Sequence, residues 1–205
     1  MKALGPNQRR RGRDAFAGRV GCACLVMAVL IFVSAAGKVP AVERMIDDRA
    51  MQEFRFIHAV AELSSWPTNV LAPEAKKFYI TILGKDRWGK GIEIYFSTNR
   101  VQKREVVVTR CARVEDSGGC HLLFISSSEH ENVPKVLEAL QNKSILTVSD
   151  DFDFCRRNGM FYMFFQQKTD ISAVIAWEVD YEAIRKAKLE TKTYLVNNAK
   201  NRRRS

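Results

Sequence analysis

The sequence has little from which to build a catalytic or metal-binding site. It contains three histidines, His58, His121 and His130, and none of them has the spacing to acidic or cysteine residues that zinc sites show. Asp151 and Asp153 fall far short of a twelve-residue calcium loop. The Gly-x-Ser-x-Gly elbow of serine hydrolases is also missing. We therefore expect no catalytic residue, no metal and no cofactor.

The central part of the chain also lacks a net charge. The formal net charge is +10, but residues 1–41 hold seven basic side chains against one acidic, a net of +6. The basic residues at 200 and 202–204 add +4, which leaves residues 42–199 balanced at zero. A groove for nucleic acid needs a basic surface. A nucleic-acid partner is therefore not predicted.

Only one long apolar run is present, GCACLVMAVLIFVSAAG at residues 21–37. It is short for a membrane-spanning helix, which needs roughly 20 residues, and it follows the basic start and precedes the small residues typical of a signal peptide. Cleavage after Ala36 or Ala41 would leave 42–199 as an exported domain, and an uncleaved anchor is the alternative. Both interpretations place the domain in the periplasm. We expect the basic tail, 200–205, to be disordered.

Cysteine is scarce in the exported domain, which holds Cys111, Cys120 and Cys155. Cys111 and Cys120 bracket the sequence ARVEDSGG, whose Gly118-Gly119 pair can turn tightly. Export leads to an oxidising compartment, so we predict a disulfide between Cys111 and Cys120, which would stabilise the fold by roughly 2 to 3 kcal/mol. Cys155 is then a buried free thiol or forms an intermolecular bridge.

The spacing of apolar residues predicts helices that alternate with short strands. Helices are expected at 47–66, at 133–141 and from 181 to about 197, with 88–96 as a further candidate. Strands are expected at 77–84, 104–111, 121–126 and 145–149, and a hairpin at 160–166 and 172–177. This alternation favours the α/β class: a three-layer sandwich with a mostly parallel central sheet, an antiparallel edge and helices on both faces.

The segment Gly84–Gly91 (GKDRWGKG) follows a predicted strand and nearly matches a phosphate-binding P-loop. Gly91 stands where a Ser or Thr hydroxyl must hold the magnesium ion. We therefore favour a simple strand-to-helix turn. Gly84, Gly89 and Lys90 remain the residues of an alternative nucleotide or small-molecule site.

A dense run of methionine and aromatic residues, Met160–Phe165 (MFYMFF), is interpreted as a core strand. If part of it lies at a sheet edge, it offers apolar anchors and unpaired backbone to a second copy or to another protein. A homodimer is thus one expected form of the chain.

Several segments together match a known pattern in order along the chain. They are Trp66-Pro67, Ile82–Gly84, CHLLFIS at 120–126, LTVSD at 146–150 and Gly159-Met160. On these residues the chain resembles the YfiR-like family from about Gln52 to the end of the last helix. The resemblance implies a non-enzymatic periplasmic regulator that binds an inner-membrane signalling protein, typically a diguanylate cyclase, and holds it inactive. The sequence departs from the family pattern at 173–177 and 190–195, which leaves the identity of the partner open.

Overall fold

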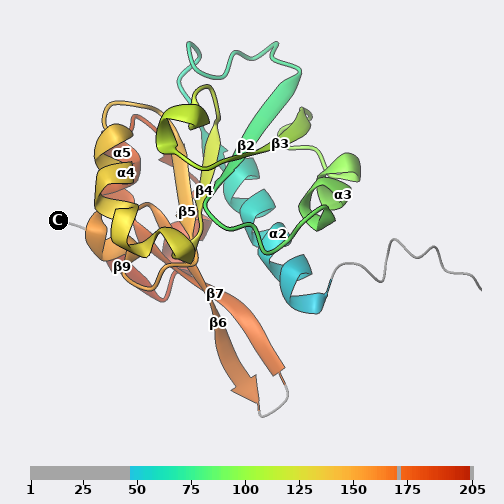
Figure 1. Ribbon diagram of the computed structural model, residues 1–205, viewed down its shortest axis with the longest axis vertical. Helices are drawn as coiled ribbons and strands as arrows, with labels where there is room; N and C mark the ends of the chain where they lie inside the picture. The colour runs from blue at the N-terminus through green and yellow to red at the C-terminus, as the bar shows by residue number, and fades with distance from the viewer. Residues whose placement is uncertain (1–46, 170–171, 204–205) are drawn as a thin grey trace, which may run out of the picture. The chain divides into compact units, whose positions relative to one another are not determined.

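The computed structural model describes residues 47–169 and 172–203 of the chain (Figure 1). The predicted signal segment, 1–41, lies outside the described residues. Within the described residues, no helix is both long enough and apolar enough to cross a membrane.

A seven-stranded sheet forms the centre of the described structure, in the order β3-β2-β4-β5-β6-β7-β9. Neighbours from β3 to β6 run parallel, β6 and β7 form an antiparallel hairpin, and β9 runs parallel to β7. The strands are β2 (Lys77–Leu83), β3 (Glu105–Cys111), β4 (Leu122–Ile125), β5 (Leu146–Ser149), β6 (Phe161–Thr169), β7 (Ser172–Asp180) and β9 (Asn201–Arg203). A separate two-stranded sheet pairs β1 (Ser64–Ser65) with β8 (Glu190–Thr191).

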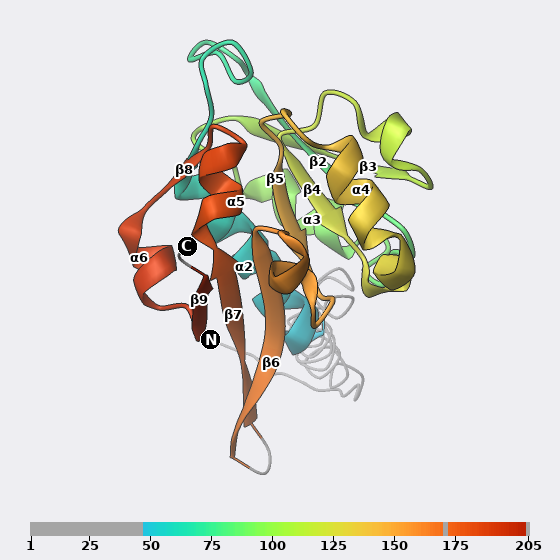
Figure 2. The same cartoon turned by 90° about the vertical axis from the view of Figure 1, so that its left-hand side faces the viewer.

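Helices cover both faces of this sheet, so the predicted three-layer α/β fold is confirmed (Figures 1 and 2). The helices α2 and α3 pack on one face, and α4 packs on the other with the 3-10 turn η4. The helices are α2 (Asp48–Glu62), α3 (Gly91–Thr98), α4 (Val133–Ala139), α5 (Tyr181–Lys186) and α6 (Thr193–Asn197), and the 3-10 turns are η2 (Val114–Ser117), η3 (Ser127–Asn132) and η4 (Phe154–Arg157).

Strand β4 shows why the apolar runs of the sequence are unbroken. Leu122 and Phe124 point into the cluster under α2, whereas Leu123 and Ile125 point into the cluster under α4. All four side chains are buried. A parallel strand covered on both faces has no solvent side, and so it carries no alternating polar residues.

Helix α2 forms where the sequence predicts it, but it ends at Glu62 rather than at Trp66. The Asp47 carboxylate caps its first turn by accepting from the backbone N–H of Arg49 and of Ala50. The apolar residues of its buried face pack on the sheet, and they are Phe54, Phe56, Ile57, Val60 and Ala61. Helix α2 is thereby fixed along one face of the parallel strands.

The prediction of one closing helix at 181–197 is wrong. Helix α5 stops because Lys188 adopts a left-handed conformation (φ +58°) and the Leu189 N–H returns to the carbonyl of Ile184. The chain then passes through β8 before α6 begins. The apolar periodicity suggested one helix because Ile184 of α5, Leu189 of the connection after it and Leu195 of α6 all face the same core.

The prediction of a disordered basic tail is also wrong for residues 201–203. These residues form β9, which pairs with β7 at Glu178–Asp180. Just before it, the Lys200 N–H donates to the carbonyl of Trp177 over 2.8 Å. A short edge strand is held by backbone hydrogen bonds, and a basic composition therefore does not exclude it.

Candidate functional site

The cysteine pair does not form the predicted bridge in the structure, where neither Cys111 nor Cys120 is part of a disulfide. The connection between Cys111 and Cys120 is not a tight turn between neighbouring strands. Strands β3 and β4 both run parallel to β2, which lies between them. Both cysteines nonetheless border the same apolar cluster under α4. The disulfide remains a prediction for the oxidised protein.

Burial keeps these thiols protonated. It raises the pKa of Cys120 to about 11 and that of Cys155 to about 12, and it also raises the pKa of Cys111, with smaller contributions from Asp116 and Glu129. The thiolate is the nucleophile in cysteine chemistry. None of the three cysteines is therefore set up as a catalytic nucleophile near neutral pH.

The loop Gly84–Gly91 is closed by its own hydrogen bonds. The Lys85 N–H donates to the hydroxyl of Ser128 over 2.9 Å, and the Trp88 N–H donates to the Asp86 carboxylate over 2.8 Å. A phosphate-binding loop needs such amides free to point at the anion. The geometry is that of a strand-to-helix turn.

The glycines of this loop have conformational roles. Gly84 has φ +91°, and a Cβ there would meet the Ser128 hydroxyl at 2.6 Å. Gly89 has φ +52°, while Lys90 is an exposed residue at the start of α3. The residues of the alternative nucleotide site thus lie together in sequence, but they shape a turn.

Arg87 binds together the carboxyl ends of the parallel strands. Its guanidinium contacts Glu53 of α2 at 2.7 Å and also Asp150, which follows β5. The Trp88 indole N–H donates to the other oxygen of Glu53 over 2.6 Å. Burial opposes the charge of Arg87, but its two carboxylate partners raise the pKa overall. Open α/β sheets usually bind ligands at this end, and here the ion pairs of Arg87 cross it.

His130 belongs to a second polar cluster beside this end of the sheet. Its Nδ1 lies 2.8 Å from the buried carboxylate of Asp151, and Arg157 donates to its Nε2 over 3.0 Å. An Nε2 that accepts leaves the proton on Nδ1, where it is donated to Asp151. The ring of Phe152 stacks on the imidazole at 5.4 Å. These contacts hold His130 in place, and among the described residues no serine or cysteine is hydrogen-bonded to its ring.

The other two histidines are also tied to the fold. His121 is buried, and its Nδ1 accepts from the Tyr79 N–H over 2.9 Å. Burial lowers the pKa of His121, so it stays neutral. His58 contacts the Tyr95 hydroxyl and the carbonyl of Arg100. Among the described residues, no group of three or more His, Cys, Asp or Glu side chains is arranged to hold a metal ion.

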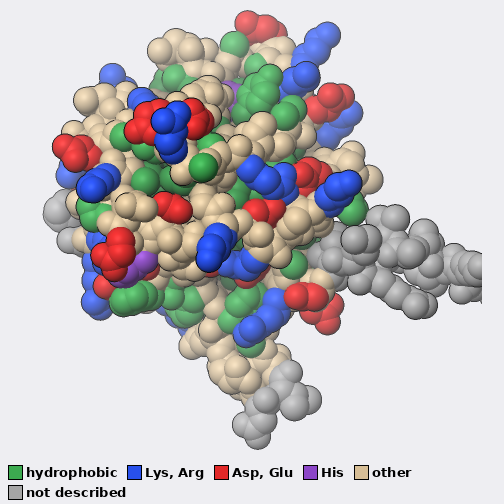
Figure 3. Space-filling view, in the orientation of Figure 1, with side chains coloured by type: hydrophobic (Ala, Val, Ile, Leu, Met, Phe, Trp, Pro, Cys, Tyr) green, Lys and Arg blue, Asp and Glu red, His purple; other side chains and the backbone are tan. Residues whose placement is uncertain are grey.

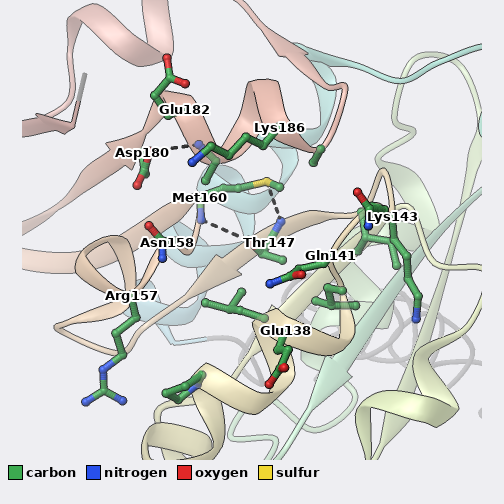
Figure 4. Close-up of a pocket in the computed structure, with 17 residues that line it drawn as sticks. Glu138, Gln141, Lys143, Thr147, Arg157, Asn158, Met160, Asp180, Glu182 and Lys186 are labelled. Atoms are coloured by element: carbon green, nitrogen blue, oxygen red, sulfur yellow. Dashed lines mark hydrogen bonds between the residues drawn. The ribbon is translucent and has the colours of Figure 1, made fainter. Parts of the chain in front are cut away.

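A groove with a volume of about 1120 Å³ lies between α4 and α5 (Figure 4). We call it the α4/α5 groove. Its base is apolar and includes Leu140, Ile145 and Met160, while charged and amide side chains of both helices and their flanking turns surround it. The charged and amide residues that line the groove are Glu138, Gln141, Asn142, Lys143, Arg157, Asn158, Asp180, Glu182 and Lys186, of which Asp180 is buried.

The base of the groove is held by a reciprocal pair of contacts drawn in Figure 4. The Met160 N–H donates to the Thr147 hydroxyl over 3.1 Å, and the Thr147 N–H contacts the Met160 sulfur at 3.4 Å. The sequence did not predict this groove because its walls come from helices far apart in the chain and carry no motif. An apolar base with a polar rim is typical of a binding surface.

The outer surface shows no region of a single charge sign on the face seen in Figure 3, where basic and acidic side chains alternate. This agrees with the zero net charge of residues 42–199. The surface therefore offers no basic groove for a phosphate backbone on that face.

A protein-family model described as YfiR/HmsC-like matches residues 52–200. The chain belongs to the YfiR/HmsC-like family. The matched range begins within α2 and ends just before β9, so the family fold comprises nearly all of the described elements of this YfiR/HmsC-like protein. No curated protein matches the chain. The family is one of periplasmic regulators of diguanylate cyclases, and the resemblance seen in the sequence is confirmed.

Proposed function

We propose that this YfiR/HmsC-like protein is exported to the periplasm, where it binds the outward-facing domain of an inner-membrane diguanylate cyclase and holds that enzyme inactive. The observation that carries the proposal is the family match over residues 52–200. The basic and apolar N-terminal segment supports export.

The arrangement of reactive groups supports a binding role over a catalytic one. The buried thiols are protonated at neutral pH, since the pKa of Cys120 is raised to about 11 and that of Cys155 to about 12. His130 is held between Asp151 and Arg157. The end of the sheet at which α/β enzymes usually bind substrate is crossed by the Arg87 ion pairs.

The α4/α5 groove is the surface that we propose for the cyclase. Its base is apolar, and a partly buried Leu137 lies on its α4 wall. Its rim carries both acidic and basic side chains, such as Glu138 and Lys186, which can orient a partner. A helix or loop of the partner fits such a groove better than a flat surface does.

Inhibition would follow from differential affinity. A regulator can shift the conformational equilibrium of its partner only by the difference between its binding free energies for the inactive and the active conformation. A tenfold difference in affinity corresponds to about 1.4 kcal/mol. The regulator needs no chemistry of its own for this effect.

The proposal is tested by capture from solubilised membranes, with the protein as bait and mass spectrometry of what is retained. We expect a membrane diguanylate cyclase to be enriched. Leu137→Arg places a charge in the groove and is expected to reduce capture at least tenfold.

Ala139→Arg is the matched control, because Ala139 is an exposed residue of the same helix that does not border the groove. It should leave capture unchanged. Retention of a cyclase by wild type and by both variants alike would mean that the partner binds elsewhere. Retention of no membrane protein by the wild type would contradict the proposed function.

A further inference from the structure

The β6–β7 hairpin projects from the body of the protein, as Figures 1 and 2 show. We call residues 163–169 and 172–177 the arm. Strand β5 pairs with β6 only at Phe161 and Tyr162, whereas β6 continues to Thr169. The outer edge of β6 therefore extends beyond β5, its neighbour in the sheet.

The hydrogen bonds of β7 show which backbone groups of β6 point outward. Outside the hairpin ladder, the Ile175 N–H donates to the Gln52 side chain over 3.1 Å, and the carbonyl of Ala173 accepts from the same amide. Ile175 lies opposite Phe165, and Ala173 lies opposite Gln167. In an antiparallel pair, residues directly opposite each other either exchange both bonds or direct both groups outward. Phe165 and Gln167 therefore direct their N–H and C=O groups away from β7.

Trp177 extends the same rule to the start of the free edge. Its carbonyl accepts from the Lys200 N–H, again outside the hairpin ladder, and it lies opposite Met163. The Met163 carbonyl therefore also points outward, just past the last residue that β5 pairs. Among the described residues, no side chain is bonded to these outward groups of Met163, Phe165 and Gln167.

The other edges of the described sheet are protected. The edge of β7 is closed by the Gln52 amide and by β9. The edge strand β3 carries Glu105 and Arg110, and charged side chains discourage strand pairing. By contrast, Met163–Gln167 (MFFQQ) contains no charged residue and no proline, and the irregularity of the hairpin comes only after Gln167.

We propose that this open edge of β6 binds the same edge of a second copy of the chain, which joins two sheets across a twofold axis at Phe165. Such an axis places Phe165 opposite its copy and Met163 opposite Gln167. The outward groups of the two strands then face each other with donors opposite acceptors. No two like charges oppose each other in this register, since the paired residues are uncharged.

Charge complementarity at the end of the arm favours a second copy as the occupant. Beyond Gln167, the second copy's Lys168 would come level with Tyr162, where β5 already occupies the edge. The loop Asp150–Asp153, which contains three carboxylates, starts at that end of β5. Asp150 and Asp151 already pair with Arg87 and His130, so the exposed Lys168 of the other copy complements Asp153, whose own contact with Arg156 is an exposed one of 3.4 Å.

This inference does not rest on the proposed function, because the arm and the α4/α5 groove share no residue. It is tested by sedimentation of the full chain over a dilution series. We expect an equilibrium between one and two chains for the wild type. A wild type that stays monomeric at the highest concentration would overturn the proposal.

Phe165→Pro and Phe165→Ala form a matched pair of variants. Both remove the ring, which lies 4.6 Å from the Arg49 guanidinium, but only proline also removes the outward N–H. The hairpin ladder keeps its bonds, since the Phe165 N–H is not part of it. We expect Phe165→Ala to dimerise and Phe165→Pro to be monomeric, with at least a tenfold weaker association. Equal dimerisation of the two variants would place the interface elsewhere.

A second design remains informative if Phe165→Pro does not fold. The proposed register places Phe164 opposite the second copy's Gln166. A Phe164→Lys, Gln166→Lys variant and a Phe164→Glu, Gln166→Glu variant should each be monomeric alone and should associate when mixed. The absence of any mixed dimer would contradict the register.

Discussion

Gly84 shows how one residue determines the shape of the turn after β2. Its φ of +91° is strained for any side chain, and an added Cβ would lie 2.6 Å from the Ser128 hydroxyl and 2.8 Å from the Glu129 side chain. We expect Gly84→Ala to lower the free energy of unfolding by about 1–3 kcal/mol, measured by urea denaturation.

Gly118→Ala is the control for that measurement. Gly118 has φ −54°, and nothing lies within 4 Å of the position of an added Cβ. Its substitution should change the free energy of unfolding by less than about 0.5 kcal/mol. Equal effects at the two glycines would show that the turn is not constrained as described.

Cys155 gives a prediction about pH. Its pKa is raised by burial to about 12, above the ordinary value of 9.0 that applies in the unfolded chain. A raised folded pKa stabilises the protein fully below the unfolded pKa, and this contribution is lost as the pH rises from about 9 toward 12. Cys155→Ala should therefore lose less stability than the wild type between pH 8 and pH 10.5 in urea denaturation. A loss of the same size in both proteins would contradict this assignment.

The cysteine pair gives a prediction about redox state. If Cys111 and Cys120 form a bridge after export, a Cys111→Ser, Cys120→Ser variant should melt at a lower temperature than the oxidised wild type. It should also inhibit the diguanylate cyclase less. The expected loss is roughly 2 to 3 kcal/mol by the loop-entropy argument. A variant that inhibits the cyclase normally and melts at the same temperature as the oxidised wild type would contradict the predicted disulfide.

At the scale of elements, strand β9 should protect the edge of β7. Removal of residues 200–205 takes away the bond from the Lys200 N–H to the Trp177 carbonyl and the pairing with Glu178–Asp180. We expect faster amide hydrogen exchange in that part of β7, with the exchange of β4 unchanged.

A tail of equal length with its basic residues replaced by glutamine is the control for this truncation. Because β9 is held through its backbone, the glutamine tail should keep the protection of β7. If the truncated chain and the chain with the glutamine tail show equally fast amide hydrogen exchange in β7, then the basic charges, and not strand pairing, protect that strand.

The elements that could be predicted from the sequence are those whose apolar residues follow one regular pattern along the chain. β4 is buried on both faces and reads as an unbroken apolar run, and α2 shows a clear apolar stripe that ends before Trp66-Pro67. The break at Lys188 was missed because its left-handed backbone leaves no mark on the apolar pattern. Strand β9 was missed because a basic tail resembles a disordered one.

The candidate site was less predictable for a related reason. The sequence indicated Cys111, Cys120 and the Gly84–Gly91 loop as candidate site residues, because each belongs to a short-range motif. The α4/α5 groove joins Leu137 of α4 to Ala183 of α5, residues that only the tertiary fold brings to one hollow. The outward edge of β6 depends likewise on where β5 stops, which no local pattern records.

At the scale of the whole molecule, two surfaces have different roles in our account. The α4/α5 groove is proposed for a membrane partner, and the arm for a second copy of the chain. Because the two surfaces share no residue, each can be disrupted while the other is kept. A Leu137→Arg variant should therefore still dimerise, and a Phe165→Pro variant should still bind a cyclase when monomeric.

The measurement that tests the central claim most directly is the rate of cyclic-di-GMP formation from GTP by membranes of the producing cell, with increasing amounts of the purified protein on their periplasmic side. Our account predicts that the rate falls and saturates with the wild type and with Ala139→Arg, and that Leu137→Arg requires at least tenfold more protein. A rate that stays constant with all three proteins would contradict the account.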